Sequence, residues 1–292
     1  MKVRRSIGAL ALLAVMPLAV AQQDMSKVVI ESQKVAEGVY MLTGAGGNIG
    51  VSVGEDGIVM IDDQFQELTP RIQEALAKLS PKPVRFVINT HWHFDHVGGN
   101  ENFGKAGAVI LAHGNVRKRM STTQLVKMFN REVPASPHIA LPVVTFESDV
   151  TVHYNDEELY VFHVDNAHTD GDGLILFRKA NVLHTGDTLF NGFYPFIDVD
   201  SGGSIDGMIA SADKVLDMVN DQTKIIPGHG PLATPQDLRA FRNMLTKLRE
   251  NVAKLIQEGK SLEETITAAP TKDLDAVWGK GFLKPEQVVQ MV

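Results

Sequence analysis

Short apolar runs and turn residues alternate along most of this 292-residue chain, and the alternation predicts a mixture of strands and helices. Between Val28 and Asp63 the runs GVYMLTG and IGVSVGEDGIVMIDD are typical of strands, and Glu55-Asp56-Gly57 is typical of a hairpin turn. Thr69-Pro70 then predicts the N-cap and first turn of a helix, after which VRFVIN resumes as a strand. The first third of the chain is therefore expected to combine a sheet with a helix.

The middle of the chain is expected to hold further strands and one long irregular segment. The run AVILAH predicts a strand, and the residues from about Asn115 to Gln124 predict a polar helix. From about Val126 to Pro142 the sequence contains three prolines and no regular period, which predicts an irregular loop long enough to be functional. Four more strands are expected from the runs VTVHY, LYVFHV, GLILF and ANVLHTGD.

Helices and one further strand complete the pattern. A helix is expected from about Ser204 to Val219, and TKIIPGHG repeats the order of an apolar strand followed by a histidine. C-terminal helices are expected from about residue 234, where Thr234-Pro235 begins a helix with a single apolar stripe. That stripe consists of Phe241, Leu245, Leu248, Val252 and Leu255. Because strands and helices alternate twice, the sequence predicts an α/β fold with two sheets layered between helices.

Residues 1–21 have the pattern of a secretory signal. Three basic residues precede an apolar run from Ile7 to Val20, and the run ends in AVA, which fits a small-x-small cleavage site. About 14 apolar residues are fewer than the roughly 20 needed to span a bilayer, so cleavage is favoured over an uncleaved anchor. The protein is therefore expected to be exported, periplasmic or secreted, with a mature start at Gln22. The general and the twin-arginine export routes both remain open.

Residues 22–292 contain no repeat and no linker, so they are expected to form one globular domain. Removing the three basic residues of the signal takes the net charge from −7 to −10, and this acidic balance argues against nucleic acid as a partner. The chain has no cysteine, which excludes thiol catalysis and leaves nitrogen and oxygen ligands for any metal. A small-molecule substrate is the expected partner, and no membrane anchor is expected after cleavage.

The segment THWHFDHVGGN, directly after the VRFVIN strand, places three histidines and one carboxylate within six residues. Residues two apart in an extended loop point the same way, so His91 and His93 can present their imidazoles to one ion. Asp95 and His96 lie just beyond and face a neighbouring point. Two metal ions therefore fit this segment better than one.

Three further candidate ligands follow apolar strands, each at a turn-like break. They are His168 in DNAHTDGDG, Asp187 in HTGDTLF and His229 in IPGHGPL. Glycines flank two of them closely, as expected where the backbone bends sharply near a ligand. A lone histidine at such a place is more often structural, but the cluster together with three matching sites favours a metal centre.

These motifs resemble those of the metallo-β-lactamase superfamily, whose H-x-H-x-D-H hallmark is present here as His91, His93, Asp95 and His96. The resemblance implies a four-layer αββα sandwich over nearly the whole mature chain. It also implies that His91, His93 and His168 hold a first zinc ion, and that Asp95, His96 and His229 hold a second. Asp187 would then bridge the two ions.

The resemblance also gives a role to Asp62, at the end of the early strand VMIDD. This carboxylate is expected to orient a ligand histidine, with its neighbour Asp63 as a second candidate; the alternative is that Asp62 caps a turn.

The expected chemistry is hydrolysis of a carboxyl derivative. A water that bridges two zinc ions has its pKa lowered to near neutrality and serves as a hydroxide nucleophile, with Asp95 placed to orient it or relay its proton. The sequence thus predicts an exported di-zinc hydrolase, similar to a β-lactamase, that cleaves a β-lactam, a lactone or an ester. Cysteine-type β-lactamases have a lysine three residues after the bridging position, where this chain has Phe190, so inefficient β-lactam hydrolysis and better turnover of lactones or activated esters are expected.

The same candidate ligands are compatible with other activities. Five histidines and two carboxylates do not strictly select zinc, so iron or manganese and an iron-dependent oxidoreductase or sulfur-metabolism enzyme are alternatives. A thioesterase similar to glyoxalase II is another. A β-lactam substrate is expected to bind chiefly through zinc and the loops around Val126 to Pro142 and Asn191 to Asp200. Side chains that could wall its pocket, or belong to the core instead, are Phe129, Phe190, Phe193, Tyr194 and Phe196.

Overall fold

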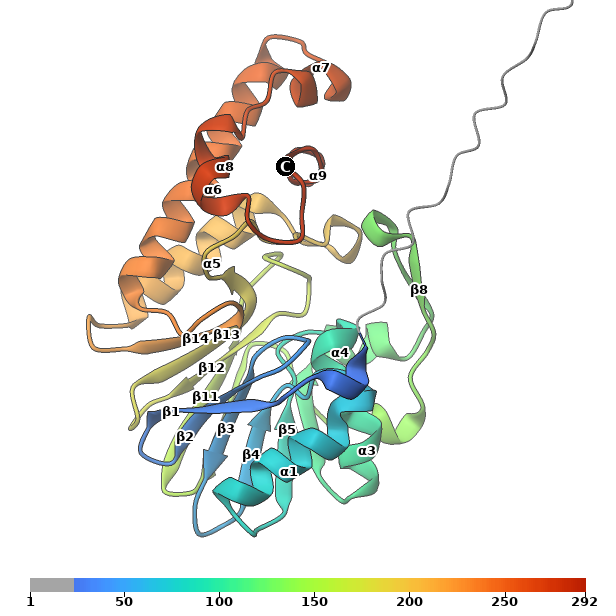
Figure 1. Ribbon diagram of the computed structural model, residues 1–292, viewed down its shortest axis with the longest axis vertical. Coiled ribbons are helices and arrows are strands. Elements are labelled where there is room, and N and C mark those ends of the chain that lie inside the picture. Colours follow the sequence, from blue (N-terminus) through green and yellow to red (C-terminus); the bar gives the residue numbers. More distant parts are fainter. Residues whose placement is uncertain (1–23) are drawn as a thin grey trace, which may run out of the picture.

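The computed structural model describes residues 24–292, so the predicted signal at residues 1–21 lies outside the described residues. Within the described part, no helix combines the length and the apolar character that a membrane crossing needs. Most strands form two large mixed sheets, and helices lie on the outer faces of these sheets (Figure 1).

The first sheet has seven strands in the order β1-β2-β3-β4-β5-β6-β9. The first four strands pair antiparallel, and the pairs β4-β5, β5-β6 and β6-β9 are parallel. The loop between β3 and β4 contains the predicted hairpin turn Glu55-Asp56-Gly57. The bounds of the seven strands are Glu31–Ala36 (β1), Val39–Thr43 (β2), Ile49–Val53 (β3), Ile58–Ile61 (β4), Val84–Ile88 (β5), Val109–His113 (β6) and Val144–Phe146 (β9).

The second sheet has five strands in the order β10-β11-β12-β13-β14. All its pairs are antiparallel except β13-β14, which is parallel because the helix α5 connects these two strands. The bounds are Asp149–Tyr154 (β10), Glu157–His163 (β11), Gly173–Phe177 (β12), Val182–Phe190 (β13) and Lys224–His229 (β14).

Helices cover the outer face of each sheet. Figure 1 shows α1 and α3 beside the first sheet, and α5 and α6 beside β13 and β14 of the second. The last three helices follow α6 and lead to the C-terminus. The bounds are Thr69–Leu79 (α1), Phe94–Val97 (α2), Asn100–Lys105 (α3), Gly114–Met120 (α4), Ile205–Met218 (α5), Pro235–Gln257 (α6), Leu262–Thr267 (α7), Lys272–Trp278 (α8) and Pro285–Gln290 (α9).

The core confirms the predicted four layers. Val59 and Ile61 of β4 pack into the cluster between the two sheets, whereas Ile58 and Met60 pack into the cluster that contains buried residues of α1. Because successive side chains of a strand point to opposite faces, β4 is buried on both sides. The second sheet and its helices share a further cluster. The fold is therefore the αββα sandwich that the sequence predicts.

Helix α6 forms as its sequence indicates. The Thr234 side chain accepts from the backbone N–H of Asp237, whose carboxylate accepts in turn from Thr234, and Pro235 occupies the first turn. The predicted apolar stripe is buried except for Leu255, which is half-buried because it lies near the exposed end of the helix.

Three local predictions are wrong. Thr69 is the first residue of α1 and makes no N-cap hydrogen bond, because the 3₁₀ turn η2 (Gln66–Leu68) leads directly into the helix. The polar helix α4 ends at Met120, four residues before the predicted Gln124, which instead begins the strand β7. The stretch from Val126 is only partly irregular, since β7 (Gln124–Val126) pairs with β8 (Arg131–Val133) as a hairpin. Strands of three residues are too short to show an alternation.

Candidate metal centre

The seven predicted ligand residues converge at one end of the two sheets. The histidine-rich segment follows β5, His168 lies between β11 and β12, and Asp187 and His229 belong to β13 and β14. Their side-chain ligand atoms form two groups, and within each group the atoms lie within 4.8 Å of one another. The first group is His91, His93, His168 and Asp187, and the second is Asp95, His96 and His229.

Asp187 lies between the two groups. One carboxylate oxygen, Oδ2, is 3.6 Å from His168 Nε2 and 3.8 Å from His91 Nε2 of the first group. The same carboxylate places Oδ1 at 3.1 Å from His96 Nε2 of the second group, and Oδ2 at 3.4 Å from His229 Nε2. A single side chain therefore reaches ligand atoms of both groups, which is the position predicted for a bridging ligand.

The second group is closed by Asp95. Its Oδ2 lies 3.3 Å from His229 Nε2 and 3.7 Å from His96 Nε2, and the two imidazole nitrogens are 3.4 Å apart. Asp95 and His229 are partly exposed, whereas His96 is fully buried. The second group therefore lies on the side of the centre that solvent and a substrate can reach.

Hydrogen bonds behind the centre fix the tautomer of the buried histidines. His168 Nδ1 lies 2.8 Å from the carbonyl oxygen of Phe196, and a carbonyl only accepts, so Nδ1 carries the proton. His93 Nε2 lies 2.9 Å from the carboxylate of Asp198, and because a carboxylate only accepts, His93 Nε2 also carries a proton. The inner nitrogens of these two rings, His93 Nδ1 and His168 Nε2, face each other at 2.8 Å.

Asp62 fixes two more histidines. It accepts from Thr90 N and Thr90 Oγ1, both at 2.7 Å, and its Oδ2 is 2.8 Å from His96 Nδ1. Because Thr90 Oγ1 donates to Asp62, it can only accept from His91 Nδ1, 3.0 Å away. His91 and His96 therefore both turn their Nε2 atoms inward, toward Asp187. The predicted role of Asp62 as the residue that orients a ligand histidine is confirmed by this contact.

The donor set fits a metal. The inner nitrogens of five imidazoles and the oxygens of two carboxylates face one small volume, where a bound cation would satisfy all of them together. His91 Nε2 is buried and has no hydrogen-bond partner among the described residues. Neutral imidazoles and carboxylates are also the ligand types that zinc prefers when no thiolate is available.

The electrostatics agree with this reading. Burial lowers the pKa of His168 to about 4 and that of His91 well below its ordinary value, which keeps both rings neutral. Burial also opposes a charge on His229, but Asp187 and Asp95 outweigh it and raise the pKa of His229 to about 9. The carboxylates therefore stabilise positive charge at the second group.

Glycines allow the backbone to approach the ligands. A methyl group at Gly47 would lie 2.1 Å from His96 Cε1, and one at Gly228 would lie 2.0 Å from Asp187 Oδ1. Neither position can hold a side chain without moving a ligand. Glycine is thus required by the packing of the centre both in the loop between β2 and β3 and near the end of β14.

A cavity of about 390 Å³ opens over the centre. Of the five predicted aromatic residues, Phe129, Phe190 and Phe196 line it. Tyr194 belongs to the core instead, where its hydroxyl lies 2.9 Å from Asp275 Oδ1. The complete lining is Ala45, His93, Phe94, Asp95, Val126, Phe129, Asp187, Phe190, Phe196, His229 and Phe282.

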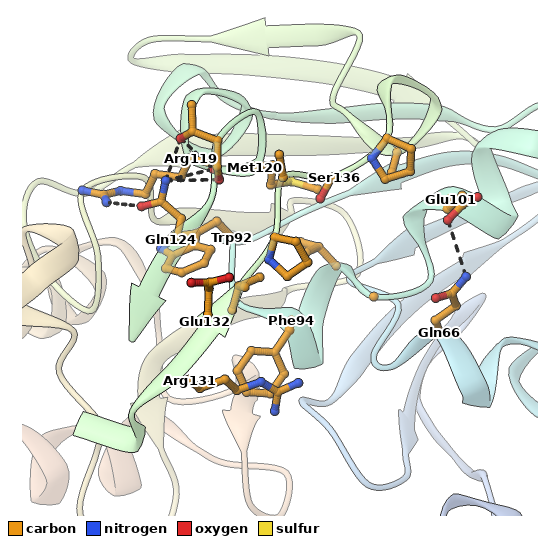
Figure 2. A pocket seen from close by; sticks show the side chains of 18 residues that line it. Gln66, Trp92, Phe94, Glu101, Arg119, Met120, Gln124, Arg131, Glu132 and Ser136 are labelled. Carbon is orange, nitrogen blue, oxygen red and sulfur yellow. Dashed lines mark hydrogen bonds between the residues drawn. The ribbon is translucent and has the colours of Figure 1, made fainter. Parts of the chain in front are cut away.

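A second cavity of about 270 Å³ lies next to the first, and Phe94 lines both. Figure 2 shows this second cavity, with the guanidinium group of Arg131 beside the ring of Phe94. The distance from Arg131 Cζ to the ring centroid is 3.4 Å. Eight of the 17 residues of the predicted loop from Val126 to Pro142 line this cavity, whereas only Val126 and Phe129 line the cavity over the metal centre.

Sequence reasoning missed two residues of the site. Asp198, which holds His93, lies in a loop 105 positions away from it, and Phe282 lies in the segment between α8 and α9. The loop DVDSGG contains two acids and offers no signal that selects Asp198, while Phe282 has no motif around it. Of the other histidines, His184 is buried 3.1 Å from the carbonyl oxygen of Asn48, and His138 is exposed outside the cavity lining.

The fold and this centre together define a metallo-hydrolase of the αββα type. The model of the metallo-beta-lactamase superfamily matches residues 42–229, and the chain belongs to that superfamily. This match includes all seven predicted ligands and ends at the last of them.

Curated relatives are similar at low identity. An acyl-coenzyme A thioesterase, MBLAC2 from Gallus gallus, is 27% identical over 51% of this chain and 57% of its own length. A hydroxyacylglutathione hydrolase from Pelagibacter ubique is 28% identical over 37% of each chain, and a metallo-beta-lactamase type 2 from Bacillus cereus is 22% identical over 60% of this chain and 63% of its own. Each alignment thus covers less than two thirds of the relative.

Solved structures share the fold. A metallo-beta-lactamase from Pontibacter korlensis superposes with a TM-score of 0.62 at 17% identity, over 74% of this chain and 99% of its own. The sec-alkylsulfatase Pisa1 from Pseudomonas sp. gives a TM-score of 0.65 at 19% identity, over 89% of this chain and 49% of its own.

Proposed function

We propose that this protein is an exported di-zinc hydrolase that cleaves a carboxyl derivative, with lactones and activated esters as the preferred substrates. One observation carries the proposal: the carboxylate of Asp187 lies 3.1 to 3.8 Å from imidazole nitrogens of both groups, His91 and His168 in the first and His96 and His229 in the second. Asp187 between two groups of three ligands supports a two-ion centre more than a single structural ion, which would need only one closed shell.

His91, His93 and His168 would hold the first ion, and Asp95, His96 and His229 the second. Two zinc ions bound there would supply an activated water as nucleophile and polarise a substrate carbonyl. Asp198, Phe196 O, Thr90 and Asp62 hold the outer nitrogens of four ligand rings, so these rings keep their orientation during turnover.

Asp95 is the residue of this chain placed to handle a proton. Burial opposes its charge, but His96 and His229 outweigh burial and lower the pKa of Asp95 to about 2, so it is a carboxylate at neutral pH. It lines the cavity and is partly exposed. Its Oδ2 can therefore orient a nucleophilic water or accept its proton.

The cavity argues against a β-lactam as the best substrate. Among residues 24–292, the lining holds no lysine or arginine that would pair with the carboxylate of a β-lactam. A bridging aspartate also neutralises part of the charge of the ions, which favours an oxygen or sulfur leaving group over an anionic nitrogen.

A thioester hydrolase is the second candidate. The thioesterase and the hydroxyacylglutathione hydrolases among the similar proteins favour it, at 24% to 28% identity. A thioester shares the carbonyl and the good leaving group of an activated ester, so the two candidates differ in the leaving group alone.

The test is a panel of lactones, activated esters, thioesters, a cephalosporin, a carbapenem and phosphodiesters, assayed with protein of measured metal content. We expect lactones or esters to have the highest kcat/KM, and close to two zinc ions per chain by elemental analysis. Thioesters as the best substrates would select the second candidate. Turnover of phosphodiesters alone would contradict the carbonyl assignment, and iron as the bound metal with no hydrolysis would select an oxidoreductase.

A further inference from the structure

Five phenylalanines surround the candidate metal centre, and they come from separate parts of the chain. Phe94 begins α2, Phe129 ends the 3₁₀ turn η3 (Lys127–Phe129) in the β7-β8 hairpin, and Phe190 ends β13. Phe196 follows β13, and Phe282 lies between α8 and α9. All five line the cavity that contains Asp95, Asp187 and His229, so apolar surface and candidate metal ligands share one space.

Four of these rings, Phe129, Phe190, Phe196 and Phe282, form a connected wall. The centroids of Phe129 and Phe196 are 4.9 Å apart, those of Phe129 and Phe282 are 6.3 Å apart, and those of Phe190 and Phe282 are 6.4 Å apart. The ring of Phe190 stacks on the imidazole of His229 at 5.1 Å. The wall therefore runs without interruption from a candidate metal ligand to the cavity mouth.

The inner and outer members of the wall differ in exposure. Phe190 and Phe196 are buried, at 1% and 6% exposed, because they pack in the core. Phe129 and Phe282 are 40% and 56% exposed, although a phenylalanine is stabilised by burial. Both exposed rings line the same cavity as the candidate ligands Asp95, Asp187 and His229.

The lining contains no partner for a charged substrate group apart from the candidate ligands themselves. Its remaining members are Ala45, Val126 and the five phenylalanines. An apolar group that entered the cavity would lose contact with water and bury the outer rings, with no polar group left unpaired. The cavity of about 390 Å³ has the size of a small-ligand site.

We infer that the phenylalanine wall binds the apolar acyl chain of the substrate, and that Phe129 and Phe282 determine how long a chain is accepted. The inference rests on the proposed function for the identity of the reacting group, but the binding of the chain itself does not depend on hydrolysis. The substrate class is then a neutral ester or lactone with a medium-length alkyl or aryl acyl group.

The first experiment measures kcat/KM for p-nitrophenyl esters from the acetate to the decanoate. Each added methylene is expected to raise kcat/KM about fourfold until the cavity is filled. Phe129→Ala and Phe282→Ala should reduce kcat/KM for the octanoate by about tenfold and leave the acetate within about twofold. Val277→Ala is the matched control, because Val277 is 58% exposed on α8 and does not line the cavity.

The second experiment measures binding without turnover. Calorimetry with neutral acetamide and octanamide should give measurable affinity for octanamide alone, with and without zinc, and both alanine variants should weaken it at least about fivefold. Octanamide binding without hydrolysis of any ester would support the wall and refute the proposed function. Ester hydrolysis with no dependence on chain length, or octanamide affinity unchanged in both variants, would overturn the inference. The chain-length series of the unmodified protein decides the question even if one variant folds poorly.

Discussion

Replacing Asp62 by asparagine tests whether the hydrogen bonds behind the centre set its affinity for metal. Asparagine keeps nearly the same shape and tolerates the backbone φ of 63° at this position. Its Oδ1 can still accept from Thr90 N, but Nδ2 now faces His96 Nδ1 where a carboxylate oxygen stood. His96 must then either leave its Nδ1–H without an acceptor or move the proton to Nε2, which is the nitrogen that faces the centre.

Both outcomes weaken metal binding at the second group. Loss of a hydrogen-bonded carboxylate behind a ligand histidine reduces metal affinity by about 10- to 100-fold, or about 1.4 to 2.7 kcal/mol. One unsatisfied buried donor also costs about 1–3 kcal/mol of folding free energy in the metal-free protein. The affinity is measured by competition between the protein and a chromophoric chelator, and the free energy of unfolding by urea denaturation with chelator present.

The adjacent Asp63 provides the matched control. It is equally buried, but its hydrogen bond goes to Gly99 N, 2.8 Å away, and burial raises its pKa well above the usual range. Asparagine keeps an Oδ1 that can accept from Gly99 N, and this bond leads to no candidate ligand, so Asp63→Asn should change zinc affinity by less than about threefold. Equal zinc affinities for the Asp62→Asn variant and the unmodified protein would refute the role of Asp62. Equal losses in both variants would point to a general effect of the substitution on folding.

Three further predictions concern the metal, the proton and the signal. Chelation should lower Tm by roughly 10 °C and two equivalents of zinc should restore it; a Tm that chelator leaves unchanged would argue against a metal centre. Asp95→Asn should lower kcat by about 100-fold or more with a much smaller change in thermal stability by circular dichroism; an unchanged kcat would remove Asp95 from the proton transfer. Mass spectrometry of protein from the periplasm or medium should find Gln22 as the first residue; an intact Met1 on such protein would contradict export with cleavage.

The layers of the fold could be predicted because they depend on local patterns. The run from Ile58 to Ile61 is apolar throughout and bounded by turn residues, which indicates a fully buried strand without any knowledge of its neighbours. The hairpin β7-β8 could not be predicted in the same way. Its strands have three residues each, and the left-handed Asn130 at its turn, with φ of 45°, is the one local sign of a reversal.

Some residues of the candidate centre could also be predicted from local sequence, and others could not. His91, His93, Asp95 and His96 are close in sequence, so their meeting at one place could be predicted. The role of Asp198 could not be predicted, since its contact with His93 depends on how the loop after β13 packs against the other sheet. The place of Phe282 in the cavity could not be predicted either, because it depends on the folding of the C-terminal helices.

Phe282, which we infer to select the acyl chain, lies in a different part of the sequence from the candidate metal ligands. All candidate ligands lie within residues 42–229, whereas Phe282 belongs to the tail that follows, and among residues 24–292 no candidate ligand makes a side-chain hydrogen bond to that tail. Substitutions around Phe282 can therefore change which acyl group is accepted without replacing any candidate metal ligand. A combinatorial library confined to this short segment would be a practical route to variants with new substrate preferences and unchanged candidate metal ligands.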